Sequence, residues 1–277
     1  MINPYKIPTP ALISCSAGRT SGFMLNNIIR AYNGKLPDDV YVCFANTGRE
    51  IEHTLSFVND CSEHWGIKIH WLELEIADER PIYRTKEVDY KSASRNGEPF
   101  ENLIDRKKYL PNPAKRFCTE QLKINVFKRF MQEKYDSWFN VVGLRHDEPR
   151  RVANVKKRNN EQQKWITIAP MYDAKHTIKD VIDFWKKQNF DLGLNSYGGK
   201  APAGNCDLCF LKGMDTTIKI LKERPELANW WIEKENQTNA TFRKDRPSYI
   251  NLLDISKQPQ AKDLFNDDDQ MTCFCHD

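Results

Sequence analysis

The sequence lacks any apolar run long enough to span a bilayer, and its first residues lack the apolar stretch of a secretory signal. We therefore expect no membrane contact and a place in the cytosol. The chain also lacks internal repeats and low-complexity tracts. Hydrophobic residues make up 40% of its 277 residues, which is enough for a folded core. This length suits one large α/β domain, alone or with a smaller appendage.

A large charge excess is absent as well. The net charge of +4 is mild, and it does not require a nucleic-acid partner, because a protein that binds small anions also needs positive charge. The basic run Lys156-Lys157-Arg158 lies in a polar stretch, 152–163, that we expect to be a loop. A solvated surface is the favoured interpretation of that run, and contact with nucleic acid is the alternative.

The first part of the chain alternates between strand and helix patterns. Short apolar runs predict strands over 11–14, 40–45 and 67–74, and helical spacing predicts helices over 21–32 and 54–65. This order favours a parallel sheet with right-handed crossovers. We therefore expect an α/β fold, with an open, mainly parallel twisted sheet and helices on both faces.

A polar loop joins the first predicted strand to the first predicted helix: Ser16-Ala17-Gly18-Arg19-Thr20-Ser21. Backbone amides at such a junction are unpaired, and the helix dipole favours anions there. Gly18 permits close backbone approach, the hydroxyls offer donors, and Arg19 adds a positive charge. The Gly-Lys-Ser/Thr ending of the kinase P-loop is missing. The loop therefore predicts a different phosphate cradle or, alternatively, a plain capped turn.

Two further strand ends carry polar groups. The strand over 40–45 runs into Asn46-Thr47-Gly48, and a predicted strand over 139–144 delivers Arg145 and Glu148, with Arg151 close behind. In an open parallel sheet, ligands collect outside the carboxyl ends of the strands. Three strand ends with donors and cations indicate a nucleotide pocket, whereas a solvated charged rim is the alternative.

The domain organisation follows from this pocket. We expect a nucleotide-binding α/β domain over 1–195 and a cysteine-bearing C-terminal region over 196–277, which is helical or irregular and packs on it. The stretch 79–115 is charged and carries four prolines. We expect an irregular excursion there, either a lid over a site or a surface insertion.

The order of these segments resembles the phosphoadenosine phosphosulfate (PAPS) reductase family within the adenine nucleotide α-hydrolase (PP-loop) superfamily. Residues 16–21 look like the family's SxGxxS loop, and residues 46–48 look like the turn after its second strand. Residues 143–151 are similar to its GxR-x-x-E-x-x-R segment. Residues 116–123 and 206–209 are similar to the segments that carry cluster cysteines in iron–sulfur members. The sequence resembles phage-encoded members of the family at least as closely as it resembles the housekeeping reductases.

The resemblance implies an adenine nucleotide as substrate, bound by residues from all of these segments. The implied nucleotide- and phosphate-binding residues are Ser16, Gly18, Arg19, Thr20, Ser21, Asn46, Thr47, Gly48, Lys123, Arg145, Glu148 and Arg151. Magnesium is a further candidate ion. Many superfamily members carry Asp where this loop has Thr20, so the loop itself does not imply a magnesium ligand.

The tail is similar to the catalytic end of the reductases, Glu-Cys-Gly-Leu-His. Here it reads Thr272-Cys273-Phe274-Cys275-His276, so that Cys273 and His276 align and Cys275 is extra. The implied catalytic residues are Cys273, His276 and Arg145. The Cys273 thiolate, its pKa lowered by His276 and nearby cations, would attack the sulfur of a sulfonucleotide. A reduced thioredoxin-like thiol would then free sulfite.

Eight cysteines in a reducing cytosol favour burial, redox chemistry or metal ligation over a disulfide framework. Cys15, Cys43 and Cys61 lie in apolar patterns and are expected in the core. The expected metal ligands are Cys118, Cys206, Cys209 and Cys275, with Cys273 as the alternative fourth. A zinc site without Cys118 would instead use the pairs Cys206/Cys209 and Cys273/Cys275. Four thiolates suit a 4Fe–4S cluster or structural zinc, and only the resemblance favours the cluster.

Three functional hypotheses follow. The leading one is a PAPS reductase-like enzyme with a thioredoxin-like reductant as partner. The second is an ATP pyrophosphatase that adenylates a nucleic acid for sulfur insertion. The third is a protein that binds nucleotide or nucleic acid without chemistry. The oligomeric state stays open, a homo-oligomer included.

Overall fold

The computed structural model describes residues 3–159, 164–194 and 204–258. Its centre is a six-stranded sheet in the order β4-β3-β2-β1-β5-β6. All neighbouring strands are parallel except β3 and β4. The strands are β1 (Ala11–Ser14), β2 (Val40–Ala45), β3 (Ile69–Ile76), β4 (Tyr83–Val88), β5 (Trp138–Val141) and β6 (Trp165–Ile168). The expected α/β class with a mainly parallel sheet is confirmed.

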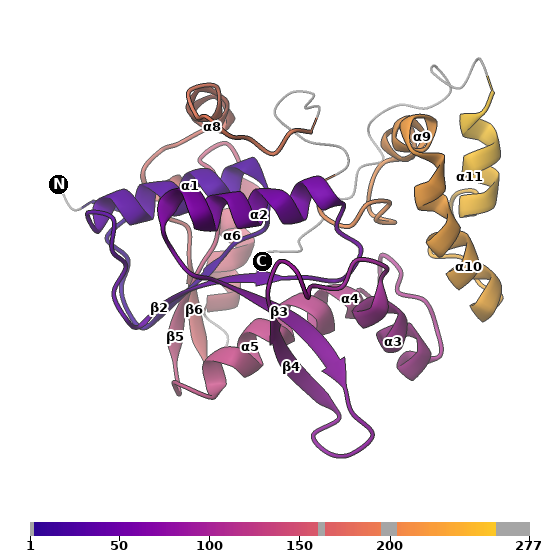
Figure 1. Ribbon diagram of the computed structural model, residues 1–277, viewed down its shortest axis with the longest axis horizontal. Helices are drawn as coiled ribbons and strands as arrows, with labels where there is room; N and C mark the ends of the chain where they lie inside the picture. The colour runs from indigo at the N-terminus through magenta and orange to yellow at the C-terminus, as the bar shows by residue number, and fades with distance from the viewer. Residues whose placement is uncertain (1–2, 160–163, 195–203, 259–277) are drawn as a thin grey trace.

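Helices cover both faces of this sheet. In Figure 1, α1 (Arg19–Ala31), α2 (Glu52–Trp65) and α8 (Ile178–Trp185) lie above it, and α5 (Asn125–Gln132) lies below. The central strand β1 is buried on both sides: Ile13 packs into the core under α1 and α2, and Leu12 packs into the opposite core. Continuous burial of this kind explains why β1 and β2 read as unbroken apolar runs.

The stretch expected to be an irregular excursion holds regular structure instead. The edge strand β4 pairs antiparallel with β3, and α3 (Glu98–Lys107) packs Phe100, Leu103 and Ile104 into the core at 1% exposure or less. The prolines misled the prediction because Pro99 stands in the first turn of α3, where proline is tolerated.

The polar stretch expected to be a loop is also different. It lies largely in α6 (Pro149–Asn159), whose Val152 and Val155 are buried against Leu144 and Ala169. Two buried valines in eleven residues are a weak helical signal, which is why the sequence favoured a loop.

The chain after Cys206 builds a separate group of helices beside the sheet (Figure 1). Tyr249, Phe242 and Trp231 fill its interior and continue the core below the sheet. Its helices are α9 (Met214–Glu223), η2 (Pro225–Leu227), α10 (Ala228–Thr238) and α11 (Tyr249–Ser256).

The remaining short helices are α4 (Phe117–Thr119), the π-helical η1 (Glu120–Ile124) and α7 (Pro170–Asp173). Among the described residues, no helix is both long and apolar enough for a membrane span.

Candidate active site

The candidate site lies where the strand order reverses direction. β1 has β2 on one side and β5 on the other, so that the crossovers from β1 and from β5 leave in opposite directions. The carboxyl ends of these three strands flank a crevice, which is the usual ligand position in open α/β sheets. All three predicted polar segments therefore meet at one edge.

The loop after β1 closes around Ser21. The Ser21 hydroxyl accepts hydrogen bonds from the backbone N–H of Ser16 at 3.1 Å and of Gly18 at 3.3 Å, and it donates to the Gly18 carbonyl at 2.9 Å. Ser16 Oγ also donates to Ser21 Oγ, at 3.0 Å. Ser21 is 2% exposed, so its hydroxyl shapes the loop from the inside. The N-terminus of the 13-residue helix α1, with the positive end of its dipole, therefore remains available to bind an anion.

Gly18 leaves open space at the loop surface. A Cβ at this position would meet only Ser16 Oγ, at 3.7 Å, and the φ of −115° is one that any residue adopts. Neither strain nor packing within the described part of the protein requires glycine here. A ligand that approaches the backbone closely is a reason for the missing side chain.

The cation of Arg19 is turned toward the segment after α8. Its guanidinium forms an ion pair with Asp191, with Nε 2.7 Å from Oδ1, and Nη2 donates to the Leu194 carbonyl at 3.0 Å. Trp185 Nε1 donates to the Arg19 carbonyl at 2.7 Å. Arg19 therefore ties α8 to the loop, and its charge is already paired.

Arg145 supplies the cation beside the loop. Its Nη1 donates to Thr20 Oγ1 at 3.3 Å, and its guanidinium pairs with Asp147 and Glu148 at 2.9 and 3.3 Å. Glu148 also binds Arg151 at 2.6 Å. The predicted residues of the β5 end are thus brought together with the loop, as a charge network that positions Arg145.

The turn after β2 is built largely from buried groups. Asn46 is fully buried; its amide donates to Glu73 at 2.6 Å, and its carbonyl accepts from the Gly48 N–H at 3.1 Å. Gly48 has a φ of +78°, and a Cβ there would lie 3.0 Å from Gly97 Cα, so only glycine fits. Asn46 and Gly48 shape the turn.

Glu50 closes the same turn from beneath. Its carboxylate accepts from the Thr47 N–H at 2.9 Å and from Thr47 Oγ1 at 2.8 Å. The backbone of Glu50 forms a bridge with that of Cys206, and Thr47 Oγ1 lies 3.5 Å from Cys206 Sγ. The turn predicted to bind nucleotide is therefore fastened to the cysteine loop. Sequence reasoning assigned Glu50 no role, and an acid directly after the Asn-Thr-Gly turn was the available signal.

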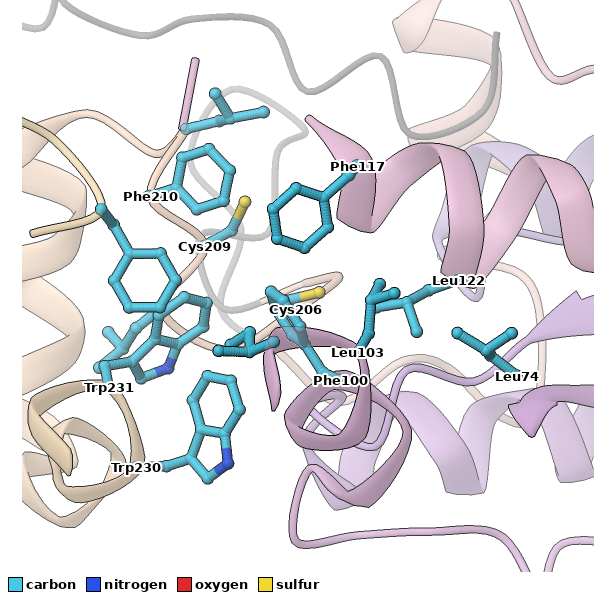
Figure 2. Close-up of a cluster of buried hydrophobic side chains, with 14 of the residues drawn as sticks. Leu74, Phe100, Leu103, Phe117, Leu122, Cys206, Cys209, Phe210, Trp230 and Trp231 are labelled. Atoms are coloured by element: carbon cyan, nitrogen blue, oxygen red, sulfur yellow. The ribbon is translucent and has the colours of Figure 1, made fainter. Parts of the chain in front are cut away.

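Three of the four expected metal ligands, Cys118, Cys206 and Cys209, line one pocket. Apolar side chains, Phe100 and Trp231 among them, form much of the remaining wall, and Figure 2 shows Cys206 and Cys209 among the surrounding rings. Burial raises the pKa of the Cys118 thiol to about 12. A metal that binds these thiols would have to displace their protons.

The CxxC loop has its own buried support in Asp207. Asp207 forms an ion pair with Arg49 and accepts a hydrogen bond from Trp231 Nε1 at 2.8 Å. The Arg49 guanidinium also lies 5.0 Å from the ring centroid of Trp230. Sequence reasoning missed this contact, which anchors the cysteine loop between the β2 turn and α10.

Lys123 stands between the loop and the thiols. It lies in the π-helical turn η1 and lines both the thiol pocket and a second pocket that contains Ser16 and Glu50. Its side chain is 7% exposed, and Nζ is 4.0 Å from Glu50 Oε1. Burial alone would lower the pKa of Lys123, but Cys206 and Glu50 outweigh burial and raise it. Lys123 is thus a buried cation.

The three thiols suit a soft metal or an iron–sulfur cluster by their chemistry. No group of three or more His, Cys, Asp or Glu side chains within 3–159, 164–194 and 204–258 is arranged to hold a metal ion. The expected ligand Cys275 and the expected catalytic residues Cys273 and His276 lie outside the described residues.

Known proteins resemble this chain in sequence. A sequence model of the phosphoadenosine phosphosulfate reductase domain matches residues 10–193. The uncharacterized nin region protein ORF290 of Escherichia phage lambda is 27% identical over 213 residues, which are 73% of this chain and 66% of that protein. The uncharacterized protein MJ0066 of Methanocaldococcus jannaschii is 27% identical over 241 residues, 83% of this chain and 42% of that protein. The chain thus spans less than two thirds of either relative.

Two solved structures match this chain at low similarity. The phosphate complex of phosphoadenylyl-sulfate reductase from Candida auris has a TM-score of 0.42 and 13% identity, and the match covers 70% of this chain and 87% of that one. The U34-tRNA thiolase NcsA from Methanococcus maripaludis, with its [4Fe-4S] cluster, has a TM-score of 0.41 and 16% identity, and the match covers 88% and 72%.

Proposed function

The chain belongs to the phosphoadenosine phosphosulfate reductase domain family, and from that premise we propose that it is an enzyme acting on an adenine sulfonucleotide. One observation carries the proposal. The loop after β1, the cation of Arg145 and a pocket lined by three thiols meet at one sheet edge, where Lys123 lines the pockets on both sides. An anion site next to buried sulfur ligands suits sulfur chemistry on a nucleotide.

The binding roles follow from the contacts. The start of α1 and the open face of Gly18 receive phosphate oxygens. Arg145, held by Asp147 and Glu148, offsets negative charge on the phosphate that leaves. Lys123 lies close enough to Ser16 to share a pocket with it and supplies a second buried cation.

The reaction we propose is thiol-dependent reduction. The Cys273 thiolate attacks the sulfonate sulfur, so that an S–S bond forms as the S–O bond breaks and the adenosine phosphate leaves with the electron pair. His276 holds the thiol proton beforehand. A thioredoxin-like dithiol then attacks the Cys273 sulfur, sulfite leaves, and the dithiol ends as a disulfide. The roles of Cys273 and His276 rest on the likeness of the tail.

The cofactor we propose is a 4Fe–4S cluster held by Cys118, Cys206, Cys209 and Cys275, with zinc as the alternative. The shared pocket of the first three thiols supports this ligand set. Such a cluster would supply a sulfur-ligated iron centre beside Lys123.

A second candidate is an adenylating enzyme that uses ATP with magnesium to activate a nucleic acid for sulfur insertion. One observation favours it: the helix α6, which follows the β5 end of the site, carries five cations and no acidic residue. A small sulfonucleotide does not need so extended a basic surface.

Product analysis tests the proposal. The full chain, purified without oxygen, is incubated with PAPS, adenosine phosphosulfate or ATP plus magnesium, together with a reduced thioredoxin. We expect sulfite from a sulfonucleotide, and no sulfite from a Cys273→Ser variant that still binds the nucleotide. Pyrophosphate from ATP without any sulfite would replace the first candidate by the second.

A further inference from the structure

The helix α6 has an unusual charge distribution. Between Pro149 and Asn159 it carries five basic residues and no acidic one, whereas the whole chain has a net charge of only +4. Cations in the last turn of a helix are favoured by the helix dipole, which accounts for the three in the last turn. The dipole disfavours cations in the first turn, and Arg150 and Arg151 stand there without an acid. Helix stability therefore does not explain the pattern.

The outer face of α6 presents cations to solvent. Val152 and Val155 fix the inner face against the sheet, and Arg150, Lys156 and Lys157 are exposed. None of these three forms an ion pair with a described residue, whereas Arg151 is paired with Glu148. Within the described residues, these three exposed cations thus have no acidic partner.

Two rings connect this face to the site. Lys156 Nζ lies 5.7 Å from the ring centroid of Tyr172, and the Tyr172 ring lies 5.0 Å from that of His146. His146 is exposed and directly follows Arg145, whose Nη1 reaches Thr20 of the α1 loop. We call this set the basic–aromatic strip: Arg145, His146, Tyr172, Lys156, Arg150 and Lys157.

We propose that the basic–aromatic strip binds a single strand of nucleic acid, with its phosphates on α6 and a base against His146 and Tyr172. The strand would end at the α1 loop, so this inference rests on the second proposed function and names the surface that holds its substrate. Rings interleaved with cations suit stacked bases and phosphates. An acidic protein partner would use the cations and leave the rings without a role.

Fluorescence anisotropy tests the strip. The probe is a labelled single-stranded RNA of about 20 nucleotides, titrated at about 50 to 200 mM salt, a range in which phosphate contacts dominate affinity. The variant is Lys156→Ala/Lys157→Ala. The matched control is Lys186→Ala/Lys187→Ala, which removes two exposed lysines after α8. We expect the α6 variant to bind roughly tenfold more weakly and to lower the salt slope by about 1.4, since each contact with a single strand contributes about 0.7.

Three results would overturn the proposal: no saturable binding by the unmodified chain, equal weakening by both double variants, or equal competition by polyglutamate. The assay needs no turnover. Affinity for ATP is measured on the same samples, so that loss of the nucleotide site is distinguished from loss of the strip.

Discussion

Glu50 joins the nucleotide turn to the thiol pocket through a few buried contacts. Its carboxylate holds both donors of Thr47, its backbone pairs with Cys206, and Oε1 lies 4.0 Å from Lys123 Nζ. A buried carboxylate with these partners offsets the cation that faces the thiols. Lys123, which lines both pockets, is therefore paired with a carboxylate that lines the pocket of Ser16.

A Glu50→Gln substitution isolates this role. The variant keeps the shape but removes the charge beside Lys123 and sets an amide donor against the donors of Thr47. We expect a loss of about 1–3 kcal/mol in the free energy of unfolding, the cost of a buried polar group without its partner. Urea denaturation at neutral pH measures it, with the exposed Glu75→Gln as the control. A loss no larger than that of the control would refute the role.

Individual side chains were the hardest part to predict from the sequence. The sequence grouped Ser21, Asn46 and Arg19 with the ligand-binding residues because their types suit phosphate. In the structure, Ser21 and Asn46 hold their own loops, and Arg19 is paired with Asp191. Ser21 binds within its own loop, whereas Asn46 and Arg19 find Glu73 and Asp191 in distant segments, and residue type alone carries no information about either kind of contact.

At the level of elements, buried strands were predictable and polar helices were not. The strands over 11–14 and 40–45 match β1 and β2 residue for residue, because a strand buried on both faces must be apolar throughout. The helices α3 and α6 were missed. Each helix buries a narrow apolar stripe beneath a charged surface. Each also has a proline at its start, Pro99 as the second residue of α3 and Pro149 as the first residue of α6.

The helix α8 supports the loop and depends on a reciprocal cap. Thr177 precedes it, and Asp180 Oδ2 accepts from both the N–H and the hydroxyl of Thr177, at 2.7 and 2.8 Å. The bond from the Thr177 N–H holds the pKa of Asp180 below its ordinary value. Trp185 at the other end reaches the Arg19 carbonyl, so a frayed α8 would loosen the loop.

Substituting Asp180→Ala should cost about 1 kcal/mol at pH 7, the usual value of such a cap. Because the folded pKa of Asp180 is lowered, its contribution is present above the unfolded value of about 3.8 and is lost as pH falls through the folded one. The difference from the unmodified chain should therefore shrink at about pH 3. Urea denaturation at both pH values measures it, and Asp183→Ala on the same helix is the control. A difference independent of pH would contradict the cap.

Across the whole molecule, one core spans the sheet domain and the C-terminal helices. Phe100 of α3 packs against Trp230 and Trp231 of α10, with ring centroids 5.2 and 6.1 Å apart. The thiol pocket lies at this junction (Figure 2). The order of motifs in the sequence predicted that these segments meet. It did not predict that Arg49 and Asp207 would lock them together, because a buried ion pair leaves no periodic pattern.

The central claim is that the α1 loop receives the phosphates of an adenine nucleotide. Gly18→Val tests it most directly, since the new Cβ would meet only Ser16 Oγ among the described residues, and the side chain would occupy the space of the ligand. Isothermal titration with PAPS and with ATP plus magnesium should show at least tenfold weaker binding of the preferred nucleotide, about 1.4 kcal/mol. The ligand-free variant should lose only the roughly 1 kcal/mol of a helix cap. Unchanged nucleotide affinity in a folded Gly18→Val variant would contradict the account.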